Sequence, residues 1–233
     1  MGTADIVTKE YMRENAIFAD AFNYLIYGGK KVIDPAGLTE IDTATSAVGK
    51  KDALQKYRDV LKAAVIKQDE KISYVLLGVE NQTDVHYAMP VRNAIYDALQ
   101  YGKQVSDIAA GHRRSQKDYS GKTGGEYLSG FLKEDHIKPV ITLVIHFGAE
   151  EWDGPLSLHE MMPIRDMEIL SYVENYRIHL IDPAKLTEEE LKPLVTSWRT
   201  TNPHIVDYWW KVDRAVKEAI ENHRIMRVGT LTI

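Results

Sequence analysis

The chain has 233 residues, of which 44% are hydrophobic and 27% are charged, as in an ordinary globular protein. It contains no cysteine, which excludes a disulfide framework, an iron–sulfur cluster, a cysteine-ligated zinc site and a thiol nucleophile. The net charge of −5 argues against a generally basic nucleic-acid-binding protein, but residues 50–122 carry 13 basic and 9 acidic side chains, enough for a phosphate-binding surface.

No apolar run approaches the roughly 20 residues that a helix needs to cross a bilayer. The first fifteen residues, MGTADIVTKEYMREN, are charged and lack the apolar core of a signal peptide. We therefore expect a soluble cytoplasmic protein without a membrane partner.

In the first part of the chain, the spacing of apolar residues predicts a helix over 8–27 that ends at Gly28. Residues 31–41 indicate a short strand with a turn. Residues 54–67 fit either a helix or a strand. The almost unbroken apolar run over 72–80 predicts a central strand that is buried on both faces.

A long helix is predicted over 87–110, and its expected apolar side consists of Val91, Ile95, Leu99 and Val105. The polar, glycine-rich stretch 111–126 predicts a mobile loop. Two further strands are expected over 138–147 and 176–182.

Two helices are expected near the end of the chain, over 187–194 and 204–224. Strands that alternate with helices indicate an α/β protein with a mixed sheet.

Two acidic side chains fall at positions where a charge is costly. Glu80 ends the apolar run, and Gln82 follows with the same side-chain direction because strand side chains alternate with period two. If the segment around Asp59 forms the neighbouring strand, the two carboxylates can converge on one divalent cation, which would compensate their charge. Oxygen ligands of this kind suit Mg²⁺. A strand-end glutamate is also a common ion-pair partner, so both interpretations stay open.

Several segments of the sequence carry a resemblance through their residues and their order: FADAFNYLIYGGKKVI, KYRDVL, YVLLGVENQTDVHYAMPVRNAIYDALQYGKQV, KEDHIKPVITLVIHFGAEEWDGPLSLHEM and YRIHLIDP. They resemble the Rpn family of recombination-promoting nucleases, some of which are described as transposases of the YhgA-like type. The resemblance covers roughly residues 8–192. It implies the PD-(D/E)XK nuclease fold, an α/β core with a central mixed sheet, flanking helices and a metal site at strand ends.

On this resemblance, Asp59 corresponds to the acidic residue of the second core strand, and Glu80 and Gln82 to the E-x-Q of the third. Asp59, Glu80 and the backbone carbonyl of Asn81 would hold Mg²⁺, with Mn²⁺ or Ca²⁺ as substitutes. Asp20, in the first helix, matches an acidic position that assists the metal site. The metal ion would lower the pKa of a bound water and neutralise charge that develops on the phosphate.

Other residues are expected to contact DNA. Arg92 and Tyr96 lie one turn apart on the predicted helix and match a polar face that contacts the scissile phosphate or the DNA backbone. For Tyr96, simple packing of the helix is an equally open interpretation. The loop over 111–126 is expected to approach DNA through its basic residues Arg113, Arg114, Lys117 and Lys122.

Two parts of the chain are expected, a nuclease-like domain over residues 1–192 and a helical C-terminal extension over 193–233. The sequence of this extension differs from the sequence that usually follows the nuclease domain in the family. The amphipathic pattern within 204–224 favours packing on the domain or on a second subunit, so a homodimer is one expected assembly.

Two functions stay open from the sequence. The leading one is a metal-dependent DNA endonuclease linked to recombination or mobile elements. The alternative is a catalytically weak or inactive relative that binds DNA or another protein through the same scaffold. The presence of Asp59, Glu80 and Gln82 favours the enzyme, whereas the altered C-terminus favours the alternative.

Overall fold

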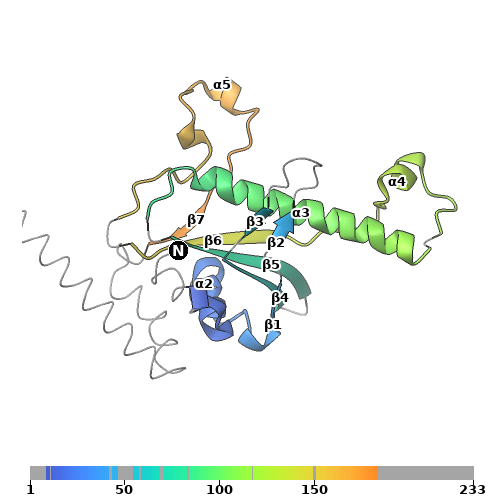
Figure 1. The fold of residues 1–233 in the computed structure, drawn as a ribbon, viewed down its shortest axis with the longest axis horizontal. Helices are drawn as coiled ribbons and strands as arrows, with labels where there is room; N and C mark the ends of the chain where they lie inside the picture. Colours follow the sequence, from blue (N-terminus) through green and yellow to red (C-terminus); the bar gives the residue numbers. More distant parts are fainter. Residues whose placement is uncertain are drawn as a thin grey trace, which may run out of the picture.

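In the computed structural model, the described residues are 9–10, 12–41, 44–46, 55–57, 59–68, 71–82, 84–116, 118–148 and 151–182. They form an α/β protein with an open, mixed, five-stranded sheet and helices against both of its faces (Figure 1). The predicted helices 187–194 and 204–224 and the boundary after residue 192 lie outside the described residues. Within the described parts, no helix combines the length and apolar character needed to cross a membrane.

The main sheet has the strand order β1 (Leu38–Glu40), β4 (Val60–Gln68), β5 (Lys71–Gln82), β6 (Val140–His146) and β7 (His179–Ile181). The pairs β1–β4 and β4–β5 are antiparallel, whereas β5–β6 and β6–β7 are parallel. A second, two-stranded sheet pairs β2 (Ala44–Ser46) with β3 (Gln55–Tyr57). The strands predicted over 72–80, 138–147 and 176–182 are thus confirmed.

The segment 54–67, whose sequence fitted either a helix or a strand, contains two strands. It contributes β3 and β4, and β4 pairs with β5 along its whole length, from Val60 opposite Val79 to Gln68 opposite Lys71. This long-range pairing outweighs the local preference of the segment. The turn predicted within 31–41 is the short 3₁₀ helix η1 (Pro35–Gly37), and β1 follows it directly.

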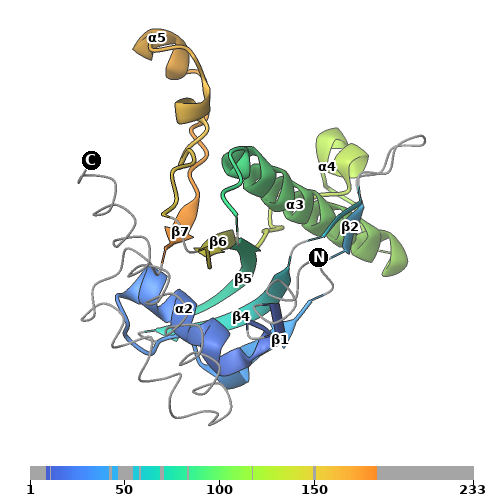
Figure 2. The same cartoon turned by 60° about the vertical axis from the view of Figure 1, so that its left-hand side comes forward.

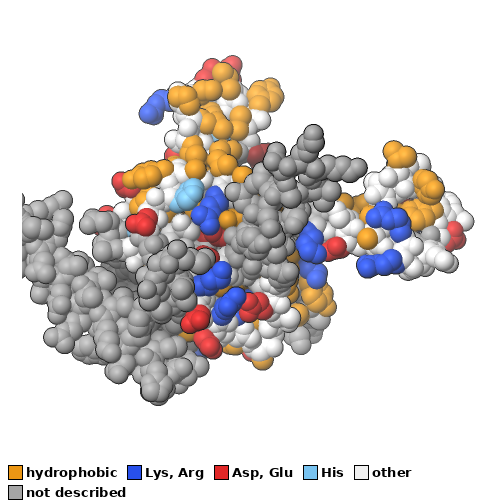
Figure 3. All heavy atoms as spheres, in the orientation of Figure 1, with side chains coloured by type: hydrophobic (Ala, Val, Ile, Leu, Met, Phe, Trp, Pro, Cys, Tyr) orange, Lys and Arg blue, Asp and Glu red, His pale blue; other side chains and the backbone are white. Residues whose placement is uncertain are grey.

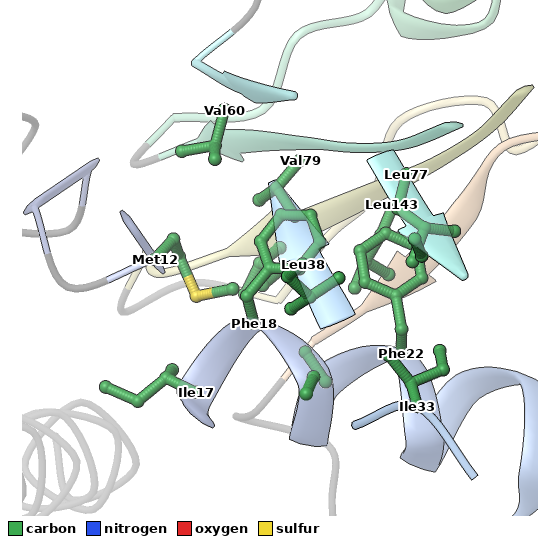
Figure 4. Packing of buried hydrophobic residues seen from close by; sticks show 14 of the residues in the cluster. Met12, Ile17, Phe18, Phe22, Ile33, Leu38, Val60, Leu77, Val79 and Leu143 are labelled. Atoms are coloured by element: carbon green, nitrogen blue, oxygen red, sulfur yellow. The ribbon is translucent and has the colours of Figure 1, made fainter. Parts of the chain in front are cut away.

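Helix α2 (Asn15–Tyr27) covers one face of the sheet and contributes aromatic side chains to the main core (Figure 4). Phe18 and Phe22 are fully buried, with ring centroids 5.0 Å apart, and they pack with strand residues such as Leu77. Burying side chains of this size contributes roughly 2–3 kcal/mol each. The helix ends at Gly28, as predicted, because φ there is 59°, a value that glycine adopts without a steric penalty.

The helix predicted over 8–27 is interrupted at Glu14, so this prediction is wrong in part. Glu14 has an extended backbone, with φ −62° and ψ 121°, and it separates α2 from the helical residues before it. Lys62 of β4 stabilises the interruption, because its Nζ donates to the Arg13 carbonyl and, at 2.6 Å, to Asn15 Oδ1. Lys62 is only 1% exposed and lies over the Phe18 ring, and burial lowers the pKa of its ammonium group.

Helix α3 (Met89–Arg114) covers the opposite face of the sheet (Figure 2). The prediction of its buried side is wrong for Val91, Ile95 and Val105, which are exposed, whereas the fourth residue, Leu99, is half-buried. The buried side of α3 instead includes three polar residues in its middle, Asn93, Asp97 and Gln100, beside Met89, Pro90, Tyr96 and Ala109. The physical reason lies in the sheet face beneath the helix, which presents polar groups such as Glu80 and Thr142 that need polar partners.

The predicted loop over 111–126 is shorter than expected. Residues 111–114 form the last turn of α3, and helix α4 (Gly124–Ser129) begins inside the predicted loop. Thr123 and Glu126 form a capping box, in which Glu126 Oε2 accepts a 2.8 Å hydrogen bond from the Thr123 backbone. The Ser/Thr-x-x-Glu spacing could have indicated this helix start from the sequence.

Glu126 predicts a measurable pH dependence of stability. Backbone N–H groups of Thr123 and Lys133, together with the Thr123 hydroxyl, donate to its carboxylate and lower its pKa from 4.5 to about 2. Because the pKa is lowered by folding, this stabilisation is fully present above pH 4.5 and is lost as the pH falls towards 2. We expect Glu126→Gln to lower Tm at pH 7 and to lower it much less at pH 2.5.

Thermal unfolding followed by circular dichroism at several pH values between 2.5 and 7 measures this difference. Glu174→Gln, at an exposed position, is the matched control. A difference in Tm between wild type and Glu126→Gln that stays constant over this range would contradict the assignment of the lowered pKa to the capping box.

An arm projects from the sheet and contains the short helices η2 (His159–Met161) and α5 (Met167–Leu170) (Figures 1 and 2). A bridge between Ser157 and Arg177 joins its two sides. At its base, the Tyr176 hydroxyl donates to Asp97 of α3, which also accepts a 2.6 Å hydrogen bond from Thr142. The arm is therefore tied to the same polar layer that lies between α3 and the sheet.

Candidate metal and phosphate site

The register of β4 and β5 brings Asp59 and Glu80 together. Val60 pairs with Val79, so continuing the ladder by one residue places Asp59 opposite Glu80. Asp59 Oδ2 accepts a 2.9 Å hydrogen bond from the backbone N–H of Asn81, which fixes the carboxylate beside the end of β5. Asp59 lies immediately before β4 and Glu80 two residues before the last residue of β5, so the two acidic residues predicted from the sequence lie at the same end of neighbouring strands.

Glu80 is a buried carboxylate with a cationic partner from α3. Its side chain is 0% exposed, and its Oε2 lies 3.0 Å from a terminal nitrogen of Arg92. A buried carboxylate is costly without such a partner. Burial is the largest single influence on the pKa of Arg92 and lowers it, but Glu80, Tyr96 and Asp59 together outweigh this effect, so the net shift of the Arg92 pKa is upward.

Tyr96 holds the Arg92 side chain in place. Its hydroxyl oxygen accepts a 3.1 Å hydrogen bond from Arg92 Nε, and the guanidinium carbon lies 5.6 Å from the centre of its ring. Burial and the nearby charge of Glu80 raise the pKa of Tyr96, so the hydroxyl stays protonated at neutral pH. Tyr96 is only 6% exposed, in line with the packing interpretation, and its contact with DNA stays a prediction. The Arg92 side chain is 31% exposed and can reach a ligand in solvent.

Asn81 and Gln82 lie next to the two carboxylates. Gln82 Nε2 donates a 2.8 Å hydrogen bond to the Asn81 carbonyl, the oxygen predicted to bind the metal. A carbonyl oxygen has two lone pairs, so this bond does not prevent coordination of a cation. Because strand side chains alternate, Gln82 shares the face of Glu80, whereas the Asn81 side chain faces the side of α2.

Asp20 lies on α2, and its Oδ2 is buried without a hydrogen-bond partner among the described residues. In the same described parts of the chain, no three His, Asp or Glu side chains approach closely enough to hold a metal ion. Asp20 is therefore not brought together with Asp59 and Glu80 into a three-carboxylate cluster.

The oxygen donors of Asp59, Glu80 and the Asn81 carbonyl fit a hard divalent cation. Two carboxylates and one carbonyl, completed by water, are a donor set that Mg²⁺ accepts. Mn²⁺ or Ca²⁺ binds the same kind of oxygen ligand. Asp59 is 21% exposed, so its carboxylate is open to water, whereas Glu80 presents its charge from the buried layer beneath α3.

The structure adds three polar residues that were not predicted from the sequence. Lys9 Nζ lies 3.7 Å from Asp59 Oδ1. Asn93 is fully buried on α3, and neither atom of its amide has a hydrogen-bond partner among the described residues. Asp97 lies one turn further along the same helix face. The signal in the sequence was a polar pair at spacing i, i+4 on a helix that must cover an apolar strand.

The basic residues predicted to bind DNA lie at the other end of α3. Arg113 and Arg114 occupy its exposed last turn, and Lys122 Nζ forms a 2.7 Å ion pair with Glu134, which raises the pKa of Lys122. Lys117 lies outside the described residues. At 1.5 Å of rise per residue, Arg113 is about 30 Å from Arg92 along the helix. Figure 3 shows basic side chains near this end, apart from the mixed charges in the middle of the same view.

Searches of protein-family models, curated proteins and solved structures find no match to this chain. The α/β class and the mixed sheet follow directly from the strand pairing. The chemistry of the molecule is therefore inferred from the residues that meet at the ends of β4 and β5.

Proposed function

We propose that this protein is a metal-dependent DNA endonuclease of the PD-(D/E)XK type, linked to recombination or mobile elements. The observation that carries the proposal is the placement of Asp59 opposite Glu80 at the ends of two paired strands, with Gln82 on the same face as Glu80. A central mixed sheet with a helix against each face and carboxylates at strand ends is also the arrangement that the resemblance to the Rpn family implies.

Each residue of the site has a chemical role in this proposal. Asp59, Glu80 and the Asn81 carbonyl would hold Mg²⁺, which supplies an activated water and neutralises charge on the phosphate. Gln82 can orient a water molecule through its amide, as a hydrogen-bonding group without charge. Arg92 presents a planar set of donors that matches phosphate oxygens, and Tyr96 fixes the direction of its side chain.

Nicking of supercoiled plasmid DNA tests the proposal. Purified protein is incubated with the plasmid in the presence of Mg²⁺ or Mn²⁺ and, in parallel, in EDTA. We expect relaxed and then linear DNA only when the divalent ion is present. Cleavage that persists in EDTA, or no cleavage with either ion, would contradict a metal-dependent endonuclease at this site.

The basic end of α3 supplies a second prediction, on DNA binding. Replacing Arg113, Arg114, Lys117 and Lys122 with glutamine should weaken binding and reduce its salt dependence. Each phosphate contact that is lost should lower the slope of log K against log salt by about 0.9. Because Lys122 is already paired with Glu134, we expect its share to be smaller than that of Arg113 or Arg114.

Fluorescence anisotropy with a labelled duplex at several salt concentrations measures this slope. Replacing the exposed Arg165 of the arm with glutamine is the control, because it removes a positive charge that belongs neither to α3 nor to the segment after it. If the variant with all four substitutions has the same slope of log K against log salt as the wild type, this end of α3 does not contact the phosphate backbone.

The ion pair between Arg92 and Glu80 also supports a second candidate function. A carboxylate neutralised by arginine is stable in the fold without a metal ion, as a non-catalytic DNA- or protein-binding relative would require. Such a protein would bind DNA equally well in EDTA and in Mg²⁺ and would not nick it. The plasmid assay together with the anisotropy measurement therefore separates the two functions.

A further inference from the structure

We infer that Arg92 and the metal ion are alternative counter-ions of Glu80, so that metal binding releases the guanidinium for the phosphate. This inference rests on the proposed metal site and names the residue that controls its affinity. Glu80 has no exposed surface, and its Oε2 lies 3.0 Å from Arg92. A charge in this position is stabilised by a close cation, and arginine provides that cation in the metal-free protein.

The two carboxylates of the site differ in how they are compensated. Asp59 is partly exposed, accepts a backbone hydrogen bond from Asn81 and has Lys9 at the longer distance of 3.7 Å. Glu80 is covered by α3 and has the short contact with Arg92. A cation that binds between the carboxylates therefore meets the guanidinium at Glu80, and like charges this close repel each other.

The contacts of Arg92 allow its terminal nitrogens to exchange Glu80 for a phosphate oxygen. Its Nε donates to the Tyr96 hydroxyl, and one terminal nitrogen contacts Glu80, so the head is held by a fixed tyrosine on one side and by an exchangeable carboxylate on the other. The side chain is partly exposed and needs no opening of the core to turn outwards. When a metal ion neutralises Glu80, the terminal nitrogens become available to a phosphate oxygen while the bond to Tyr96 keeps the side chain near the site.

Metal affinity of an Arg92→Met variant tests this exchange without any measurement of cleavage. Methionine keeps an unbranched side chain but has no charge and no oxygen that could bind the ion. Removing the competing cation should make Mn²⁺ bind on the order of tenfold more tightly, by titration calorimetry or by electron paramagnetic resonance of free Mn²⁺. Arg165→Met, which removes an exposed arginine of the arm, should leave the Mn²⁺ affinity unchanged.

Thermal stability gives a second readout. Without metal, Arg92→Met should have a lower Tm than wild type, because Glu80 loses its counter-ion. A tenfold gain in affinity corresponds to about 1.4 kcal/mol, so saturating Mn²⁺ should raise Tm by roughly 3–6 °C more in the variant than in the wild type. Equal increases in the two proteins would overturn the inference.

A second pair of variants, in which Glu80 is replaced by the neutral glutamine, keeps the Tm measurement decisive if Arg92→Met alone does not fold. In a Glu80→Gln background the carboxylate is gone, so the additional Arg92→Met change should cost little Tm. If the loss of Tm is as large in that background as in the wild-type background, Arg92 is not the counter-ion of Glu80.

The failure of this inference can be distinguished from the failure of the proposed function. Unchanged Mn²⁺ affinity in Arg92→Met, with metal-dependent nicking by the wild type, overturns the exchange and leaves the nuclease proposal standing. Tighter Mn²⁺ binding in the variant, with no nicking by the wild type, supports the exchange and contradicts the nuclease. No Mn²⁺ binding to either protein overturns the exchange.

Discussion

Glu80→Gln is expected to abolish metal-dependent nicking of plasmid DNA, with a loss of rate of at least ~10²-fold. Glutamine keeps the size and most of the hydrogen bonding of the side chain, but it removes the charge that faces the metal ion. Glu80 is fully buried, and the side chain of its partner Arg92 is 31% exposed and can turn to water once the carboxylate is gone. We therefore expect a nearly unchanged Tm alongside the loss of cleavage.

A matched set of variants makes this result interpretable. Asp59→Asn should lose activity to a similar extent, because it removes the other charge that faces the metal ion. Its stability should be largely kept, since the remaining carbonyl oxygen can still accept the hydrogen bond from the Asn81 N–H. Glu174→Gln, the same chemical change at an exposed position of the arm, should cleave like the wild type. Equal nicking by Glu80→Gln, Asp59→Asn and the wild type would exclude these carboxylates from the reaction.

Lys62→Ala is expected to cause the largest loss of stability, about 3 kcal/mol in the free energy of unfolding. The change leaves a cavity next to Phe18 and removes both hydrogen bonds that Lys62 makes across the interruption at Glu14. Lys62→Met fills the same space but leaves the Arg13 carbonyl and Asn15 Oδ1 without this donor. Its cost should be smaller, about 1–2 kcal/mol.

Urea denaturation followed by tryptophan fluorescence and by circular dichroism gives both values. Lys67→Ala, which lies on the same strand near its end, is the comparison for losing a lysine outside the site of the interruption. If Lys62→Ala and Lys67→Ala have the same free energy of unfolding, the buried ammonium does not stabilise the break between the two helical segments.

The strands of the sheet could be predicted because their signal is local. The run over 72–80 is almost continuously apolar, as is typical of a strand buried on both faces, and residues 75–80 of β5 are buried. The interruption at Glu14 could not be predicted in the same way. It depends on Lys62, which is 47 residues from Asn15 in the sequence, and apolar periodicity carries no information on that contact.

The buried side of α3 was predicted wrongly for a related physical reason. Periodicity assigns apolar residues to the core, and it therefore selected Val91 and Ile95. The sheet beneath α3 carries Glu80, so the helix turns its polar side inwards and leaves the apolar residues exposed. A buried charge in one element thus determined which face of another element is buried, and a pattern within one segment does not contain this coupling.

The candidate site could be predicted in part. Asp59 and Glu80 were identified because an acidic residue at the end of an apolar strand is unusual and because the sequence segments around them resemble a nuclease family. Lys9 was missed because it is an ordinary residue in its own segment and reaches Asp59 only through the packing of the fold. Asn93 was missed although it forms a polar i, i+4 pair with Asp97, because apolar periodicity alone was used to assign the buried side of the helix.

The contact between Tyr176 and Asp97 has a consequence for how the protein is made. These residues are 79 positions apart, and Tyr176 follows β6 by thirty residues. When a ribosome has released the chain through β6, the strands that carry Asp59 and Glu80 and the helix that carries Arg92 are already present. At a typical speed of synthesis, Tyr176 is added a few seconds later, and only then can Asp97 form this contact. Among the described residues that meet between α3 and the sheet here, Tyr176 of the arm is therefore synthesised after Glu80, Arg92, Asp97 and Thr142, although the arm contributes none of the residues proposed to carry out the chemistry.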